Sequence, residues 1–100
     1  MKSLAILLVL MPLAAHADWE VRQNDDHVRF IEAPCANVAV LAQLARLGAD
    51  PAIYYEAHAR VGGTNYNACW TNRGISVHLV YEDGDQGVIP RGDVKKIEST

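Results

Sequence analysis

The sequence predicts a small α+β domain in which one helix packs on an antiparallel β-meander that carries a single disulfide. Three observations lead to this fold class. One segment, 36–47, has the apolar pattern of a helix, and several short β-rich runs are separated by turn residues. The third observation is a pair of cysteines in a chain that begins with an export signal.

Residues 1–17, MKSLAILLVLMPLAAHA, have the pattern of a secretory signal peptide. Lys2 precedes an apolar run, and Ala15 and Ala17 form the A-x-A arrangement that signal peptidase reads. The run is shorter than the roughly 20 residues that cross a bilayer, so we expect cleavage after Ala17 and no membrane span afterwards. The expected location is the periplasm or the extracellular space.

Cleavage would leave residues 18–100 as one exported domain, and its net charge would be −4 because Lys2 is lost from a chain of charge −3. A domain of this size commonly needs a covalent link for stability. Cys35 and Cys69 are the only cysteines, so we predict that they form a disulfide, worth roughly 3.5–4 kcal/mol for a loop of this length. The mild acidity and the scattered basic residues argue against nucleic acid as a partner.

The first half of the domain is predicted to contain a hairpin and the helix. The runs 19–23 and 27–32 flank the turn-prone NDD, which favours a β-hairpin. Pro34 near its start and Gly48 at its end delimit the helix over 36–47. The apolar arc of this helix is broad for a single sheet, which makes it a candidate surface for oligomerisation.

The second half is predicted to be a β-meander. Its three main runs, 53–61, 66–72 and 75–82, are separated by GGTN and RG, which are both turn signals. Two further runs, 88–90 and 94–97, are expected to add short strands at the edge.

Cys69 and Trp70 are neighbours on one predicted strand, so they face opposite sides of the sheet. A two-residue loop at Arg73-Gly74 would place Trp70 opposite Val77 in an apolar core. A three-residue loop that also includes Asn72 would instead turn Cys69 inward and Trp70 outward. The segregation of apolar residues favours the first loop. The need of the disulfide to reach the helix favours the second, which we adopt.

An outward Trp70 would create a binding surface on a rigid sheet. Tyr66 and His78 would share its face, and aromatic residues dominate binding hot spots. The first hypothesis for function is therefore a non-enzymatic binding or interaction protein that acts outside the cytoplasm. Its partner, a macromolecule or a small ligand, is not identified by the sequence.

Glu56, His58 and Arg60 alternate along one predicted strand and therefore share a face, with His78 available from another strand. A carboxylate, an imidazole and a guanidinium are the groups that acid–base cleavage of a phosphodiester needs. In outline, one helix with a sheet that carries these residues resembles the small secreted microbial ribonucleases. A ribonuclease-like hydrolase is the second hypothesis.

The third hypothesis is a structural subunit of an envelope or phage-related assembly, which would oligomerise through the helix. No cofactor is predicted. No metal site is predicted either, because His58 and His78 would stand about 10 Å apart on strands separated by a third, too far to share one ion.

Overall fold

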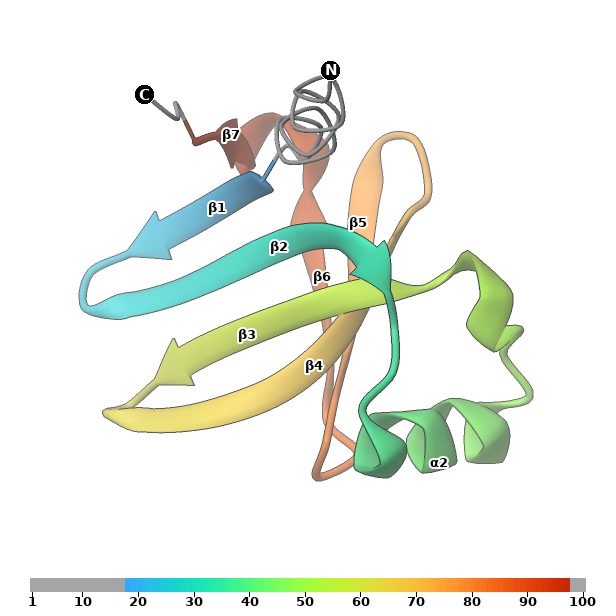
Figure 1. The fold of residues 1–100 in the computed structure, drawn as a ribbon. Helices are drawn as coiled ribbons and strands as arrows, with labels where there is room; N and C mark the ends of the chain where they lie inside the picture. The colour runs from blue at the N-terminus through green and yellow to red at the C-terminus, as the bar shows by residue number, and fades with distance from the viewer. Residues whose placement is uncertain (1–17, 98–100) are drawn as a thin grey trace, which may run out of the picture.

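The computed structural model describes residues 18–97 and has the predicted α+β architecture. A seven-stranded antiparallel sheet and one α-helix make up the regular structure of this range (Figure 1). The predicted signal peptide lies outside the described residues. Within them, no helix has both the length and the apolar character that a membrane crossing requires.

The strands follow one another as a meander for most of the chain. They are β1 (Asp18–Gln23), β2 (Asp26–Pro34), β3 (Tyr55–Val61), β4 (Thr64–Asn72), β5 (Ser76–Tyr81), β6 (Gln86–Pro90) and β7 (Lys95–Lys96). The predicted turns join them: Gly62 and Gly63 both adopt positive φ between β3 and β4, the conformation that a tight two-residue hairpin needs.

The helix α2 (Val38–Leu47) begins two residues later than predicted and ends where predicted. The side chain of Asn37 caps its start by accepting a hydrogen bond from the Val40 amide at 3.1 Å. Gly48 ends it in the left-handed conformation, φ 70°, as the sequence indicates. A short 3-10 turn, η2 (Pro51–Ile53), follows, so β3 starts later than the predicted strand.

The sheet curves strongly, because a short segment of the chain must connect the strands at its two opposite edges. Its order is β6-β5-β4-β3-β2-β1-β7, so β6 and β7 lie at opposite edges. Only residues 91–94, which include the turn η3 (Arg91–Asp93), separate them. In Figure 1, β5 and β6 cross behind β2, β3 and β4. The curved sheet therefore has two different faces: a concave inner face, which the sheet itself encloses, and a convex outer face.

Both faces of the sheet contain a hydrophobic core. The inner core consists of apolar and aromatic residues from β2, β3, β4 and β5: Val28, Phe30, Ala57, Ala59, Ala68, Trp70, Val77 and Leu79. The outer core lies under α2, which covers only the part of the outer face near β4 and β5. This core consists of Val40, Leu44, Tyr54, Cys69 and Val80. Cys69 and Trp70 are thus both buried, one in each core.

The orientation that we adopted for Trp70 is wrong. Four residues, 73–76, separate the paired residues Asn72 and Val77, rather than two or three. The Asn72 side chain accepts from the Gly74 amide at 2.9 Å, and Gly74 has φ 95°, which stabilises this longer turn. Side chains alternate between the two faces of a sheet, so a loop of four residues places each side chain on the same face as a loop of two residues would. Trp70 therefore lies on the inner face with Val77 and Leu79, as the first alternative predicted.

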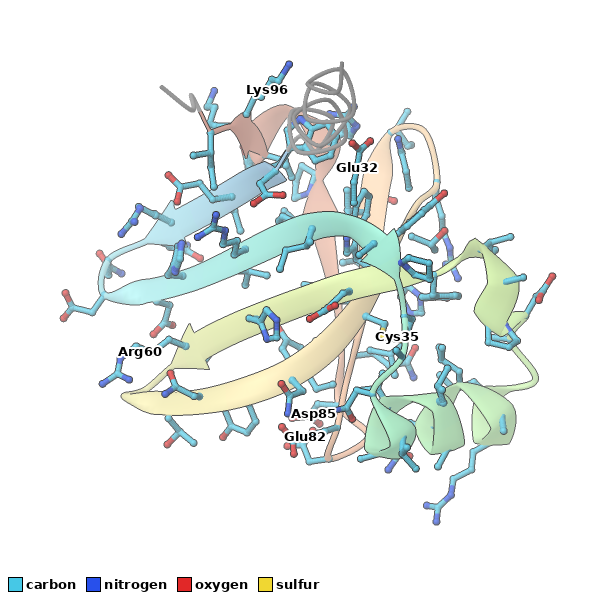
Figure 2. All side chains as sticks on the ribbon, in the orientation of Figure 1. Glu32, Cys35, Arg60, Glu82, Asp85 and Lys96 are labelled. Carbon is cyan, nitrogen blue, oxygen red and sulfur yellow. A yellow bond between two sulfur atoms is a disulfide. The ribbon has the colours of Figure 1, made fainter. Side chains whose placement is uncertain are left out.

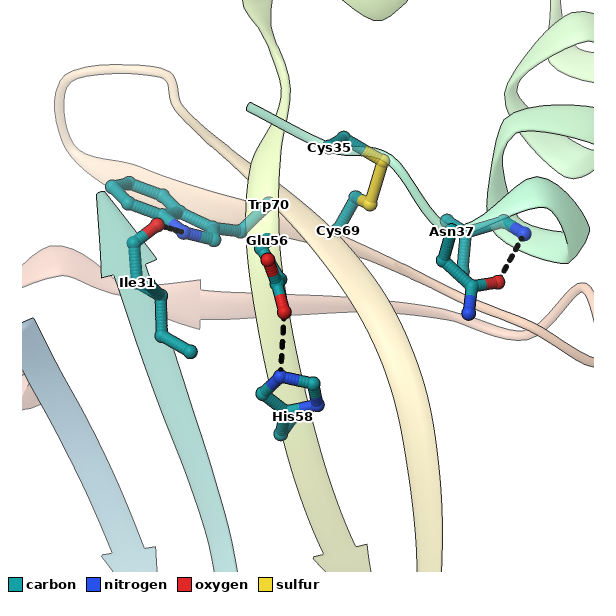
Figure 3. The surroundings of a disulfide bond; sticks show 8 residues. Ile31, Cys35, Asn37, Glu56, His58, Cys69 and Trp70 are labelled. Carbon is teal, nitrogen blue, oxygen red and sulfur yellow. Dashed lines mark hydrogen bonds and ion pairs between the residues drawn. A yellow bond between two sulfur atoms is a disulfide. The ribbon is translucent and has the colours of Figure 1, made fainter. Parts of the chain in front are cut away.

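The predicted disulfide between Cys35 and Cys69 is present, with the two α-carbons 5.7 Å apart. The pairing of β2 with β3 shifts register between Phe30 and Pro34, just before Cys35. Past this irregularity the chain reaches the outer face, where the bond joins it to β4 beside α2 (Figure 3). The disulfide belongs to the core under the helix, and Trp70 belongs to the other core.

Candidate functional site

A cleft of about 240 Å³ opens at one end of the inner face. Its walls are mostly aromatic, with three polar side chains among them. The residues that line it, which we call the aromatic cleft, are Trp19, Phe30, Glu32, Tyr55, Trp70, Asn72, Val77, Arg91 and Val94. They come from five strands and from the segment that links β6 to β7.

The register of the strands brings the four aromatic rings to the same level. Trp19 pairs with Phe30 across β1 and β2, and Tyr55 pairs with Trp70 across β3 and β4. The Trp70 ring lies at the centre: its centroid is 5.3 Å from that of Tyr55, 5.6 Å from that of Phe30 and 6.1 Å from that of Trp19. These are the separations and tilts that aromatic pairs favour.

Trp70 and Phe30 form the floor of the cleft, and Trp19 and Tyr55 form its walls. Trp70 is only 8% exposed, and its indole N–H donates to the carbonyl of Ile31 at 3.2 Å (Figure 3). Tyr55, by contrast, is 41% exposed. The floor is therefore fixed by the fold, whereas a wall can contact a ligand.

Three polar side chains also line the aromatic cleft: Glu32 from β2, Asn72 from β4 and Arg91 from η3. None of the four ion pairs that join described residues includes Arg91. Glu32 does make an interaction within the chain. One guanidinium and one carboxylate thus accompany the apolar walls.

The predicted surface patch of Tyr66, Trp70 and His78 does not form. Tyr66 is on the inner face with Trp70, but it packs edge-on against Tyr81, ring centroids 6.1 Å apart. His78 is on the outer face and only 6% exposed. The prediction failed because it assumed that only one face of the sheet is covered. In the structure, the curvature of the sheet buries the inner face, and α2 buries part of the outer face.

His78 is held in a buried hydrogen-bond network. Its Nδ1 lies 2.8 Å from the Tyr54 hydroxyl and 3.2 Å from the Arg73 guanidinium, and its Nε2 lies 2.8 Å from Oε1 of Gln86. A guanidinium only donates, so Nδ1 accepts and Nε2–H donates to Gln86. This tautomer uses both ring nitrogens, so His78 has a structural explanation.

Glu56, His58 and Arg60 share the outer face of β3, as predicted. His58 Nε2 and a Glu56 carboxylate oxygen are 2.8 Å apart (Figure 3), and Arg60 donates to Asn65 at 3.1 Å. His78 does not join them: it lies on β5, with β4 between, and contacts Tyr54 of the core under α2. The carboxylate–imidazole pair is therefore present, and His78, the predicted second imidazole, is not beside it.

His58 of this pair lines an open polar depression of about 440 Å³ on the outer face, and Glu56 is not part of its lining. Its lining, here called the polar depression, includes His27, Arg29, His58, Arg60, Asn65 and Asn67. Two of these side chains have carboxylate partners: Asp18 accepts from Arg29 at 2.8 Å, and Glu20 lies 3.1 Å from His27. Hydrogen bonds from Arg22 and then His27 lower the pKa of Glu20 below its ordinary value.

The two candidate sites lie on different faces and toward different ends of the sheet. Figure 2 labels Glu32 of the aromatic cleft near the end of β2, and Arg60 of the polar depression near the end of β3, which runs antiparallel to β2. Within residues 18–97, no cluster of three or more histidine, cysteine or acidic side chains has the geometry to hold a metal ion.

Sequence reasoning did not find the aromatic cleft, although it singled out Trp70. The lining residues are scattered between positions 19 and 94 and come together only in the folded sheet. Comparison with protein-family models, with curated proteins and with solved structures found no match.

Proposed function

We propose that the protein is an exported, non-enzymatic binding domain that holds a small ring-bearing ligand in the aromatic cleft. The observation that carries this proposal is the cleft itself: an open volume of about 240 Å³ among four aromatic side chains. Sites for small molecules are commonly concave, lined by apolar and aromatic groups, and equipped with a few polar side chains. A volume below the usual range for drug-sized ligands suits a ligand with a single ring.

The walls of the cleft are ordered before a ligand arrives. The four rings project from four adjacent hydrogen-bonded strands, and their mutual packing fixes them. Ordering side chains on binding costs about 0.5–1.5 kcal/mol for each flexible group. A preformed aromatic site avoids much of this cost, which supports a binding role for the cleft.

Export is supported by two features of the chain. Residues 1–17 have the pattern of a cleaved signal peptide, and the disulfide is of the kind that oxidising compartments maintain. Mass analysis of the protein recovered from a periplasmic or secreted fraction should give a chain that begins at Asp18. Retention of residues 1–17 would contradict export by this route.

Binding can be tested with benzyl alcohol, a neutral compound with one ring. Titration followed by NMR should shift the resonances of the Trp19 and Trp70 indole groups. Tyr55→Ala should weaken binding by about tenfold, since an aromatic contact contributes on the order of 1 kcal/mol or more, and should leave the fold intact because Tyr55 is exposed.

Val38→Ala is the matched control, because Val38 is an exposed apolar residue on α2, away from the cleft. It should bind benzyl alcohol as the wild type does. Failure of single-ring compounds to bind at millimolar concentrations, or equal binding by the Tyr55→Ala variant, would reject the aromatic cleft as the site.

A ribonuclease-like hydrolase is the second candidate, and the hydrogen-bonded pair of Glu56 and His58 favours it. The imidazole would act as general acid or base, the carboxylate would orient it, and Arg60 in the polar depression would stabilise phosphate charge. Against this candidate, His78, the predicted second imidazole, lies elsewhere. The other imidazole of the depression, that of His27, lies 3.1 Å from the Glu20 carboxylate.

An RNA cleavage assay between about pH 5 and 8, where imidazole commonly changes charge, separates the two candidates. If the second holds, Glu56→Gln and His58→Ala should each abolish cleavage without loss of stability, because both side chains are partly exposed. The binding proposal expects wild-type protein to leave RNA intact.

A further inference from the structure

We propose that the ligand of the aromatic cleft carries a carboxylate in addition to its ring, and that Arg91 binds this carboxylate. The inference rests on the proposed binding function and narrows it to carboxylates with a planar ring. Two features of the cleft carry it: the lack of a free donor on its floor and the guanidinium at its side.

The floor of the cleft can recognise a ring but not an anion. The indole N–H of Trp70 is the polar group of the floor, and it already donates to the Ile31 carbonyl. Trp70 and Phe30 therefore present apolar ring surfaces to the cleft. The ring of a ligand can pack edge-on or offset against these surfaces. An anionic group of the ligand must find its partner elsewhere in the lining.

Arg91 supplies that partner. Its side chain is exposed, lines the cleft, and forms none of the ion pairs among the described residues. Its backbone is fixed, since the Arg91 amide donates to the Ile75 carbonyl at 2.9 Å at the start of η3. A guanidinium presents parallel N–H groups that match the two oxygens of a carboxylate, which makes arginine the usual residue for this recognition.

Phenylacetate and phenylacetamide provide a matched pair of probes, because they share a ring and a shape and differ in charge. Isothermal titration of the folded, disulfide-bonded protein should show phenylacetate binding at least about tenfold more tightly, as expected when a hydrogen bond to a charged group replaces a neutral one. Phenethylamine, which carries the opposite charge, should bind more weakly than either probe.

Two variants test the role assigned to Arg91. Arg91→Gln should remove the preference for phenylacetate over phenylacetamide. Arg46→Gln, which removes an exposed arginine from α2 outside the cleft, should alter neither affinity.

The outcomes separate this inference from the function on which it rests. If neither probe binds, the proposed function fails. If both bind equally, or if Arg91→Gln keeps the preference for the anion, the cleft binds rings but the role of Arg91 is wrong. Tighter binding of phenethylamine than of phenylacetate would also overturn the inference.

Discussion

Cys69 and Trp70 are adjacent in β4 and are buried on opposite faces of that strand, at 0% and 8% exposure. Cys69 lies under α2 and is bonded to Cys35, whereas Trp70 is the centre of the aromatic group on the inner face. A strand whose neighbouring residues are both buried separates two cores. Mutations at the two positions should therefore affect stability through different parts of the molecule.

Trp70→Ala should destabilise the domain by about 3–5 kcal/mol, because it leaves a large cavity in the inner core. This cost is a large fraction of the stability of a small domain, so the variant should be largely unfolded. Urea denaturation followed by circular dichroism measures the change. A loss below about 1 kcal/mol, the size typical of a tolerated substitution, would contradict the burial of Trp70.

Fluorescence quenching gives an independent check of the same burial. In a Trp19→Phe background Trp70 is the only tryptophan, and its emission should be quenched poorly by an aqueous quencher. The background variant must itself remain folded, and circular dichroism verifies this. Efficient quenching in the folded state would show that Trp70 reaches solvent.

Cys35→Ser and Cys69→Ser should each lower stability by roughly 3.5–4 kcal/mol in the chain-entropy account, because the bond closes a loop of sequence separation 34. Thiol titration of the unfolded, unreduced wild type should find no free thiol. Cys69→Ser should cost at least as much as Cys35→Ser, since Cys69 is fully buried and Cys35 only partly. Two titratable thiols in the wild type would contradict the bond.

The helix, the disulfide and most strands could be predicted from the sequence, because their signals are local. Gly48 marks the end of α2, and turn residues mark the hairpins. The face of the sheet on which Trp70 lies could not be predicted, because it depends on a four-residue turn after Asn72 and on the burial of both faces of the sheet. The aromatic cleft could not be predicted either, because its four rings meet only when β1, β2, β3 and β4 pair in register, and Arg91 and Val94 reach it from near the other end of the chain.

Tyr54→Phe should destabilise the domain by about 1 kcal/mol, because it removes the hydroxyl that donates to Nδ1 of the buried His78. Tyr55→Phe is the matched control: it removes a hydroxyl from the next residue, whose side chain is exposed, and should change stability by less than about 0.5 kcal/mol. Urea unfolding of both variants makes the comparison. Equal effects would show that the contact with His78 contributes nothing specific.

Alkaline pH should destabilise the domain through Tyr81. Burial raises the pKa of its phenol above the ordinary value, and the carboxylates of Asp85, Asp83 and Asp26 raise it further. The folded state therefore holds this proton more tightly than the unfolded state does. The resulting contribution to stability is fully present below the unfolded pKa, about 10, and is lost as the pH rises through the higher folded value.

Tyr81→Phe should flatten this dependence, because phenylalanine keeps the ring that packs edge-on against Tyr66 and has no proton to lose. Asp85→Asn should weaken the dependence without removing it, because the desolvation that raises the pKa most remains. Urea midpoints for the wild type and both variants, measured at pH 8 and at about pH 10.5, give the comparison. If the wild type and Tyr81→Phe lose stability equally between these two values, another group must cause the alkaline loss, and the raised pKa of Tyr81 would have no part in it.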